Sequence, residues 1–529
     1  MRGKTVNQLD SSMLNIGSVR QHFFDDVLIE SVENVERVVH SPARDPASPV
    51  LKADRPWEHV LECTVSAVSI LQDPNDHLFK CWYMEGDNDP HKLAQKANFE
   101  DPDTTLLRIC YAESQDGIRW NKPLLGIQKD CGQDTNIVLG GRDYGSVYGM
   151  DPLIDPHEPD PSRRFKALYT WLPRDLRGMQ NVAACSSDGI HWKPFDEKPS
   201  FGRFGNRLDD VAKVFYDPVG RIFIMTSRHD SMYAGSLNLN NPRVGSFTLP
   251  YYPHDYYRRN KRRIWQSVSP DFIHWTEPYP ALVPTDGFDG IDECFYGMPQ
   301  FSMGDVRVGF LNVFQYVQNR LTVQLAYSRN GCEWKRFNKG QTWLDHGAPG
   351  AWDSVMATIE NRPVPVGNEW FIYHGGASCH HDWWLAGRKE GLDVPEARDI
   401  SLAKYGVGLL RMRQEGIVGM HANHVRQGIM ITRPLISEGS NLVINAACSG
   451  KGTITAEVAD VSDSILPGFS RQECDVFSGD SINHVMSWRG RTDIPVHKGR
   501  STYPEPENRR FRKFRFFLRD AEIYSMQLV

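Results

Sequence analysis

The chain has 529 residues and a mass of 60.3 kDa, and its 60 Lys and Arg against 66 Asp and Glu give a formal net charge of −6. This balance argues against a nucleic-acid-binding protein that depends on a general excess of positive charge. An apolar content of 40% with 24% charged residues is that of a globular protein, which excludes a disordered, collagen-like or coiled-coil chain.

Membrane and export signals are missing from the sequence. No stretch of about 18 apolar residues exists, so no membrane span is expected. The N-terminus has no apolar segment of roughly 7 to 15 residues, so no secretory signal is expected and the protein is predicted to be cytoplasmic. The ten cysteines form no C-x-x-C pair, which indicates free thiols rather than disulfides or a zinc site. We expect no cofactor and no bound metal.

Residues 1–57 are predicted to form an N-terminal extension with one strand-like segment, HFFDDVLIES at 22–31. This segment is expected to close the following repeat array from outside the repeat order, or to lie across an interface.

Five similar units follow between residues 58 and 425. Each has an apolar strand, a turn and an aromatic-rich strand, at 65–84, 151–171, 211–227, 294–314 and 354–376. Four units then carry a Ser, a turn pair such as Asp-Gly or Asn-Gly, and a Trp, which indicates a hairpin end. These segments end at Trp120, Trp192, Trp275 and Trp334. Five four-stranded units with almost no helix predict a five-bladed β-propeller, with a pair of large β-sandwiches as the alternative.

The pattern changes after residue 425. Short alternating strands predict a separate antiparallel β-sandwich over residues 426–529. The basic residues between Arg509 and Arg515 alternate with Phe511, Phe514 and Phe516. We expect them on the solvent-exposed face of a strand, not in a nucleic-acid patch.

Acidic residues stand at matching positions before the first strands of the repeats. In a propeller these strands line the central channel, so the residues at their starts face a shared pocket. The acids in units two to five are Asp151, Asp210, Glu293 and Asp353, and unit one offers Glu58 beside Trp57. Converging carboxylates raise some pKa values, which gives an enzyme a protonated acid beside an ionised base. Paired carboxylates cleave glycosidic bonds, although each acid alone could instead cap a turn or pair with arginine.

These residues resemble those of the five-bladed propeller glycosidases of glycoside hydrolase families 32, 43, 68 and 130. Met150-Asp151-Pro152 resembles the Asp-Pro of family 32 that stabilises the transition state, and Glu293-Cys294 resembles the Glu-Cys pair of its acid/base. Trp57-Glu58 resembles family 130. The overall organisation, with its C-terminal β-sandwich, is similar to family 32-like bacterial proteins.

Two features depart from the family 32 pattern. The Asn-Asp-Pro-Asn-Gly run with the nucleophile is missing, and the similar Asp73-Pro74-Asn75 falls in a turn at the far end of a strand. Glu293 opens the fourth unit, whereas the family's acid/base belongs to the third blade, where Asp210 stands.

The resemblance implies a glycoside hydrolase that acts on a carbohydrate. Glu293 would be the general acid, Asp151 would orient substrate or stabilise an oxocarbenium-like transition state, and Asp210 or Glu58 would be nucleophile or base. The residues predicted to bind substrate are Trp57, Glu58, Arg228, Asp353 and His374. The His-rich segment 374–382 is expected at the pocket rim, with metal ligation as the alternative.

Two other functions stay open. A family 130 type phosphorylase would use phosphate as nucleophile, with Arg228 and His229 as its ligands, and a propeller without catalysis would only bind carbohydrate. No nucleic acid and no membrane is expected as a partner, and the oligomeric state is not predicted.

Overall fold

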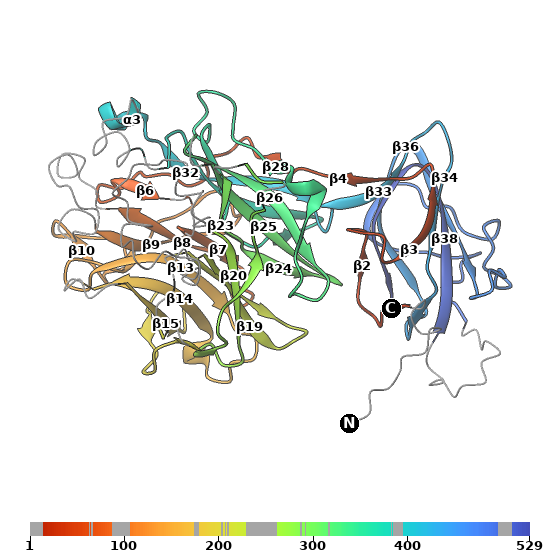
Figure 1. Cartoon of the computed structure of the whole chain (residues 1–529), viewed down its shortest axis with the longest axis horizontal. Helices are drawn as coiled ribbons and strands as arrows, with labels where there is room; N and C mark the ends of the chain where they lie inside the picture. The colour runs from red at the N-terminus through yellow and green to blue at the C-terminus, as the bar shows by residue number, and fades with distance from the viewer. Residues whose placement is uncertain are drawn as a thin grey trace.

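The computed structural model of the protein describes residues 14–62, 64, 67–86, 106–173, 179–202, 205–206, 208, 211–228, 262–285, 288–290, 293–315, 318–381, 383, 395–495 and 510–529. Helical structure in these residues amounts to α3 (Pro395–Arg398) and the 3₁₀ turns at Pro161–Arg163, Phe337–Gly340 and Ile400–Leu402. Everything else with regular structure is β-strand, which confirms the predicted all-β class (Figure 1).

Three antiparallel β-sheets follow one another along the first half of the chain. The first contains β6 (Val60–Glu62), β7 (Val68–Gln72), β8 (Phe79–Gly86), β9 (Leu107–Ser114) and β12 (Ile137–Leu139). The second contains β13 (Ser146–Ile154), β14 (Phe165–Leu172), β15 (Gln180–Ser186) and β16 (Lys193–Pro194). The third contains β18 (Ala212–Asp217), β19 (Ile222–Arg228), β20 (Ile264–Ser269) and β22 (Tyr279–Leu282). Two short pairs lie beside them, β10 (Lys129–Asp130) with β11 (Gln133–Asp134), and β17 (Ser200–Phe201) with β21 (His274–Trp275).

Two further groups of strands share one bridge between Leu321 and Met356, and we call them the fourth and fifth sheets. The fourth contains β23 (Glu293–Gly297), β24 (Gln300–Met303), β25 (Val306–Gln315), β26 (Arg320–Ser328), β27 (Lys335–Arg336) and β28 (Thr342–Leu344). The fifth contains β29 (Met356–Ile359), β30 (Val364–Val366), β31 (Glu369–Ala377), β32 (Tyr405–Arg413) and, from the N-terminal region, β5 (Ala43–Arg44).

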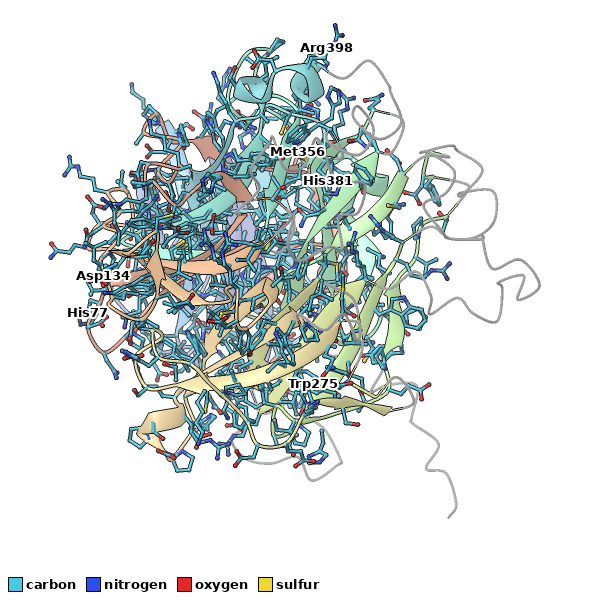
Figure 2. All side chains as sticks on the ribbon, turned by 90° about the vertical axis from the view of Figure 1, so that its left-hand side faces the viewer. His77, Asp134, Trp275, Met356, His381 and Arg398 are labelled. Carbon is cyan, nitrogen blue, oxygen red and sulfur yellow. The ribbon has the colours of Figure 1, made fainter. Side chains whose placement is uncertain are left out.

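The five sheets pack on one another in a cycle. Buried clusters join the first sheet to the second through Trp82 and Phe165, and the second to the third through Leu168 and Phe223. The cycle continues from the third to the fourth and from the fourth to the fifth, and the fifth returns to the first. Figure 2 views the cycle along its axis. Each sheet therefore buries both faces against its neighbours, which explains why the strands are almost continuously apolar.

The predicted hairpin ends are confirmed, because the chain after each motif pairs back on the strand before it. In every copy the Ser hydroxyl oxygen accepts the backbone N–H three residues later, at 2.8–2.9 Å. The Asp or Asn two residues after the Ser accepts the two N–H groups that follow the turn. The turn residue has a positive φ of 72–81°, filled by Gly three times and by Phe272 once. A short polar motif thus ends the third strand of four sheets in the same way.

A second repeated turn was not anticipated from the sequence. Asp73, Asp155 and Asp217 each precede a proline where the first strand of a sheet ends, and each accepts the N–H two residues later. Asp73 is fully buried and also binds Lys80 at 2.8 Å and Arg164 of the second sheet. The segment Asp73-Pro74-Asn75 is therefore a structural turn that links two sheets.

Residues 418–528 form a second body with N-terminal strands (Figure 1, right). Its C-terminal strands are β33 (Val418–Ala422), β34 (Gly428–Thr432), β35 (Leu435–Ser437), β36 (Leu442–Ala459), β37 (Asp480–Val485) and β38 (Arg510–Leu528). Its N-terminal strands are β1 (Leu14–Asn15), β2 (Gln21–His22), β3 (Ile29–Glu33) and β4 (Glu36–Val39). The predicted strand at 22–31 is thus split between β2 and β3, which pair with β38 and β34.

The basic cluster of β38 was expected on a solvent-exposed face, and the structure contradicts this expectation. Phe514 and Phe516 point into the core, and Arg512 on the same face is fully buried. On the other face Lys513 is 5% exposed and binds Glu30 and Asp463 at 2.7 Å. The prediction failed because the apolar core covers one face of β38, and Glu30 and Asp463 cover Lys513 on the other.

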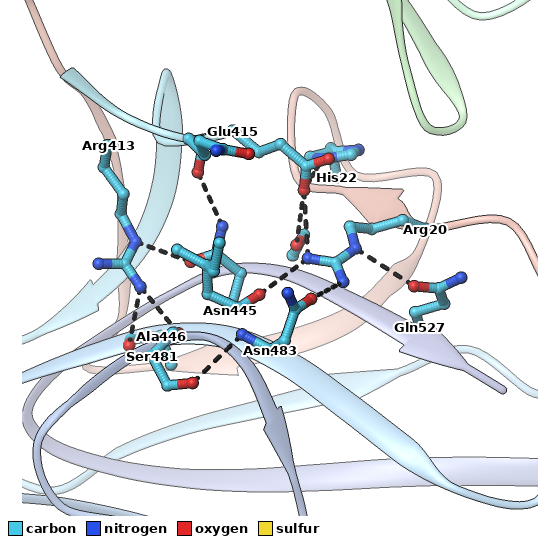
Figure 3. Close-up of polar contacts among 12 residues, drawn as sticks. Arg20, His22, Arg413, Glu415, Asn445, Ala446, Ser481, Asn483 and Gln527 are labelled. Carbon is cyan, nitrogen blue, oxygen red and sulfur yellow. Dashed lines mark hydrogen bonds and ion pairs between the residues drawn. The ribbon is translucent and has the colours of Figure 1, made fainter. Parts of the chain in front are cut away.

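The two bodies meet at a buried polar cluster (Figure 3). The His22 ring is 3.1 Å from Asp305, in the turn between β24 and β25, and 3.3 Å from Glu415, in the turn between β32 and β33. Arg20 also pairs with Glu415, at 3.3 Å. Burial alone would lower the pKa of His22, but the two carboxylates outweigh it and raise that pKa. The junction therefore depends on an imidazolium between two carboxylates.

Candidate functional site

All five sheets contribute residues to one cavity on the axis of the cycle, from β7, β13, β18, the start of β24 and the turn between β29 and β30. Its lining residues are Ser69, Ile70, Asp151, Lys213, Val214, Phe215, Pro299, Gln300, Glu360, Asn361 and Arg362. The free space measures about 10 Å³, which holds about one water molecule. We call it the axial cavity.

Asp151 is the predicted catalytic residue that lines this cavity. It follows a bulge in β13 at residues 149–150, where Gly149 has a φ of 52°. Its Oδ1 accepts the Ser69 hydroxyl at 2.9 Å, and its Oδ2 accepts the Val214 N–H at 2.6 Å. Both oxygens of the carboxylate therefore accept a hydrogen bond, which fixes its orientation.

Lys213 lies between two carboxylates in the cavity wall. Its Nζ is 3.6 Å from Asp151 Oδ1 and 3.7 Å from Glu360 Oε2, and it donates to the Val68 carbonyl at 3.3 Å. Asn312 donates to Glu360 Oε1 at 3.0 Å. Asp151 and Glu360 are both under 5% exposed, and their two negative charges face two cations, Lys213, which is 3% exposed, and Arg362, which also lines the cavity. This gives two fixed carboxylates joined by one cation.

A second group of side chains comes from the end of β19, the residues just before β20, the strand β23 and the segment after β31. The Arg228 and Arg262 guanidinium carbons lie 3.8 and 4.7 Å from the ring centre of Tyr296, and the Tyr296 hydroxyl is 2.7 Å from His381 Nε2. His381 is labelled in Figure 2. We call these four residues the rim cluster. The backbone N–H of Arg228 donates to the carbonyl of Val211, and the N–H of Val214 donates to Asp151. The three residues from Val211 to Val214 are extended, so they separate the rim cluster from Asp151 by about 10 Å.

Glu293 begins β23, three residues before Tyr296, and is half-buried. Its Oε2 accepts the Gly290 N–H at 2.9 Å, and its Oε1 accepts the Gln315 side-chain amide at 3.3 Å. It does not line the axial cavity. Asp210 and His229 lie outside the described residues.

Trp57 and Glu58 lie in a polar cluster inside the first sheet. Glu58 accepts the Tyr83 hydroxyl at 2.5 Å and Lys122 Nζ at 2.7 Å. Trp57 donates to Asn136 at 2.9 Å, and Asn136 donates to Tyr83 at 2.6 Å. We call these five residues the Glu58 cluster. The Glu58 side chain is fully buried. Its contacts hold the residues before β6 against β8 and against the residues that follow β9.

Asp353 and His374 form a buried pair at the start of the fifth sheet. Asp353 Oδ2 lies 3.3 Å from His374 Nε2 and 3.0 Å from Arg44 of the N-terminal segment. Burial alone would raise the pKa of Asp353, but His374 and Arg44 hold it below its ordinary value. Burial lowers the pKa of His374, which leaves a neutral ring. The pair therefore anchors β5, and neither residue lines the axial cavity.

Sequence reasoning missed Lys213, Glu360, Asn361 and Arg362. A signal was present, because Lys213 stands in the apolar run VAKVF, and Glu360 to Arg362 interrupt MATI and VPV. Charged residues are rarely buried without partners, so such positions in a buried strand mark a polar interior.

Metal and membrane features were also searched in the described part of the chain. No group of three or more His, Cys, Asp or Glu that could hold a metal ion was found there. No helix of this part is long and apolar enough to cross a membrane.

Comparisons with known proteins give matches in structure alone, since no protein-family model and no curated protein matches the sequence. A putative glycoside hydrolase from Bacteroides ovatus is 14% identical, with a TM-score of 0.43, over 70% of this chain and 97% of that chain. A β-1,2-mannobiose phosphorylase from Listeria innocua is 11% identical, with a TM-score of 0.44, over 73% and 98%. An N-acetylgalactosamine deacetylase from F. plautii is 12% identical, with a TM-score of 0.42, over 73% and 97%. The three descriptions differ in activity, so the likeness assigns none to this chain.

Proposed function

We propose that the protein is a glycosidase whose substrate binds over the axial cavity of a five-bladed β-propeller. In this proposal the five sheets are the blades of the propeller, and the second body, which contains β1 to β4 and β33 to β38, is the β-sandwich. The observation that carries the proposal is that all five sheets line one cavity with two carboxylates, Asp151 and Glu360, and Lys213 between them. Paired carboxylates at a concave polar site are the equipment for glycosidic bond cleavage.

Each acid has a role that follows from its contacts. Asp151 accepts a hydrogen bond on each oxygen, so in this proposal it stabilises positive charge at the sugar ring rather than donating a proton. Glu293, half-buried on the strand that carries Tyr296, is the general acid in this proposal. Asp210, which stands just before β18 in the sequence, is the nucleophile or base in this proposal. Trp57, Glu58, Asp353 and His374 enter the proposal as structural groups, because their contacts lie inside single sheets or at the N-terminal anchor.

The free space of the axial cavity is too small for a sugar ring. The substrate therefore sits between the cavity and the rim cluster. There Arg228, Tyr296 and His381 contact its hydroxyl groups.

Sugar release from a panel of oligosaccharides and aryl glycosides tests the proposal. Asp151→Asn should lower the rate at least about 10³-fold, the scale of losing one charge-stabilising group. Asp155→Asn is the matched control, because Asp155 is also a buried, lysine-paired carboxylate of the same sheet but lies outside the cavity. Equal rates in the two variants, corrected for folded protein, would contradict the proposal.

Phosphorolysis is the second candidate, favoured by the two guanidinium groups that share the Tyr296 ring. It predicts a sugar phosphate as product and a rate that rises with inorganic phosphate. Release that is independent of phosphate supports hydrolysis, and binding by calorimetry without any turnover would contradict both.

A further inference from the structure

One histidine in the segment after β31 is held by a buried carboxylate. Glu396 Oε1, on α3, accepts the Nδ1–H of His380 and the backbone N–H of the same residue, both at 2.7 Å. Glu396 is 3% exposed, whereas the side chain of His380 is 37% exposed. The other oxygen of Glu396 is buried and has no partner among the residues that the structure describes. The carboxylate therefore serves to hold His380.

The charge of Glu396 keeps the proton of the His380 ring on Nδ1. Burial alone would raise the pKa of the Glu396 carboxyl, but its hydrogen bonds with His380 hold that pKa below its ordinary value. An ionised carboxylate only accepts hydrogen bonds, so Nδ1 carries the hydrogen that it donates. In the neutral ring the lone pair is then on Nε2, to which no described residue bonds. A histidine that a carboxylate orients in this way has the form of a general base.

The segment that carries His380 also forms part of the rim cluster. The next residue, His381, lies 2.7 Å from the Tyr296 hydroxyl, and Trp383 shares a buried cluster with Tyr296. In Figure 2 His381 lies nearer the centre of the cycle than Arg398, the last residue of α3. Because the proposed substrate sits between the axial cavity and the rim cluster, His380 stands beside it on a segment that is fixed from both sides.

We propose that His380 is the general base of the glycosidase and that Glu396 is its positioning residue. The inference rests on the proposed function, in which Asp210 is nucleophile or base, and assigns the base to His380 instead. His380 Nε2 takes a proton from a water molecule, whose oxygen forms the new bond to the anomeric carbon. The glycosidic bond breaks, and the leaving oxygen keeps its electron pair and takes the proton of Glu293. Because water attacks directly, the anomeric configuration is inverted.

Sugar release by His380→Ala tests the inference. The rate should fall at least about 10²-fold, the smaller contribution of a general base, and added imidazole should restore part of it. Glu396→Gln should lower kcat and leave KM unchanged, because it alters the orientation and basicity of the ring but not substrate binding. His191→Ala is the matched control, since His191 Nδ1 also pairs with a carboxylate, Asp188 at 2.8 Å, but in a hairpin end of the second sheet. It should keep the native rate, with or without imidazole.

The anomer that is released first, followed by proton NMR, tests the same step in the native protein. An inverted sugar is the expected result, and a retained one would overturn the inference because it requires a covalent nucleophile. Turnover that survives in His380→Ala but not in Asp151→Asn would overturn the inference and leave the proposed function standing. A native protein that cleaves no glycoside would overturn both. Should His380→Ala not fold, the anomer decides.

Discussion

The Glu58 cluster and the axial cavity are built from the same groups, yet they differ in how completely these groups are bonded. In the Glu58 cluster both carboxylate oxygens accept hydrogen bonds, and Lys122 donates to Glu58, Asp54 and a backbone carbonyl. In the axial cavity Asn361 Nδ2 and Gln300 Oε1 are buried without a partner. A saturated buried network holds a fold together, whereas an unsaturated one leaves bonds for a ligand.

Among the variants that test this comparison, the largest loss of stability is expected at Glu58. Glu58→Gln leaves the Lys122 ammonium, which is 3% exposed, with only the exposed Asp54 as a counter-charge. Breaking a buried ion pair costs about 3 to 5 kcal/mol, so urea unfolding should show a loss of this size. Asp54→Asn, the control at the exposed end of the same lysine, should cost under about 1 kcal/mol. Equal losses of stability in Glu58→Gln and Asp54→Asn would contradict the account of the Glu58 cluster as one buried, fully bonded unit.

The polar cluster around His22, where the two bodies meet, extends the comparison to a titratable group. Because the folded-state pKa of His22 is raised, its contribution to stability is complete below the unfolded pKa and is lost as the pH rises through the folded pKa. The free energy of unfolding should therefore fall with rising pH above about 6.5, by about 1.4 kcal/mol per unit of pKa difference. His22→Gln should flatten this slope in urea titrations at several pH values. A slope that His22→Gln leaves unchanged would assign the pH dependence to other groups.

A smaller effect is expected from Ser69→Ala, which removes one hydrogen bond to Asp151. One buried hydrogen bond contributes about 1 kcal/mol, so stability should fall by about that amount. The rate of sugar release should fall by a larger factor than the folding equilibrium constant does, because Asp151 loses the group that orients it. Loss of stability without loss of turnover would place Asp151 outside the reaction.

The repeats were predictable because their turns are local. Ser-x-Asp and Ser-x-Asn close their own hydrogen bonds within three residues, so four hairpin ends could be located from sequence. Asp151 could be placed because it belongs to a first strand in the repeat order.

The bonding of each acid could not be predicted. Glu58 and Asp151 occupy similar sequence positions, and their difference arises from Lys122 and Ser69, which are 64 and 82 residues away in the chain. The burial of Arg512 depends on strands that pair with β38 from both ends of the chain.

A crystal of Asp151→Asn soaked with an oligosaccharide that the native protein cleaves tests the central claim most directly. We predict a sugar ring between the axial cavity and the rim cluster, with a sugar oxygen within hydrogen-bond distance of residue 151. A sugar bound on another face of the sheets, or on the C-terminal body, would contradict the account.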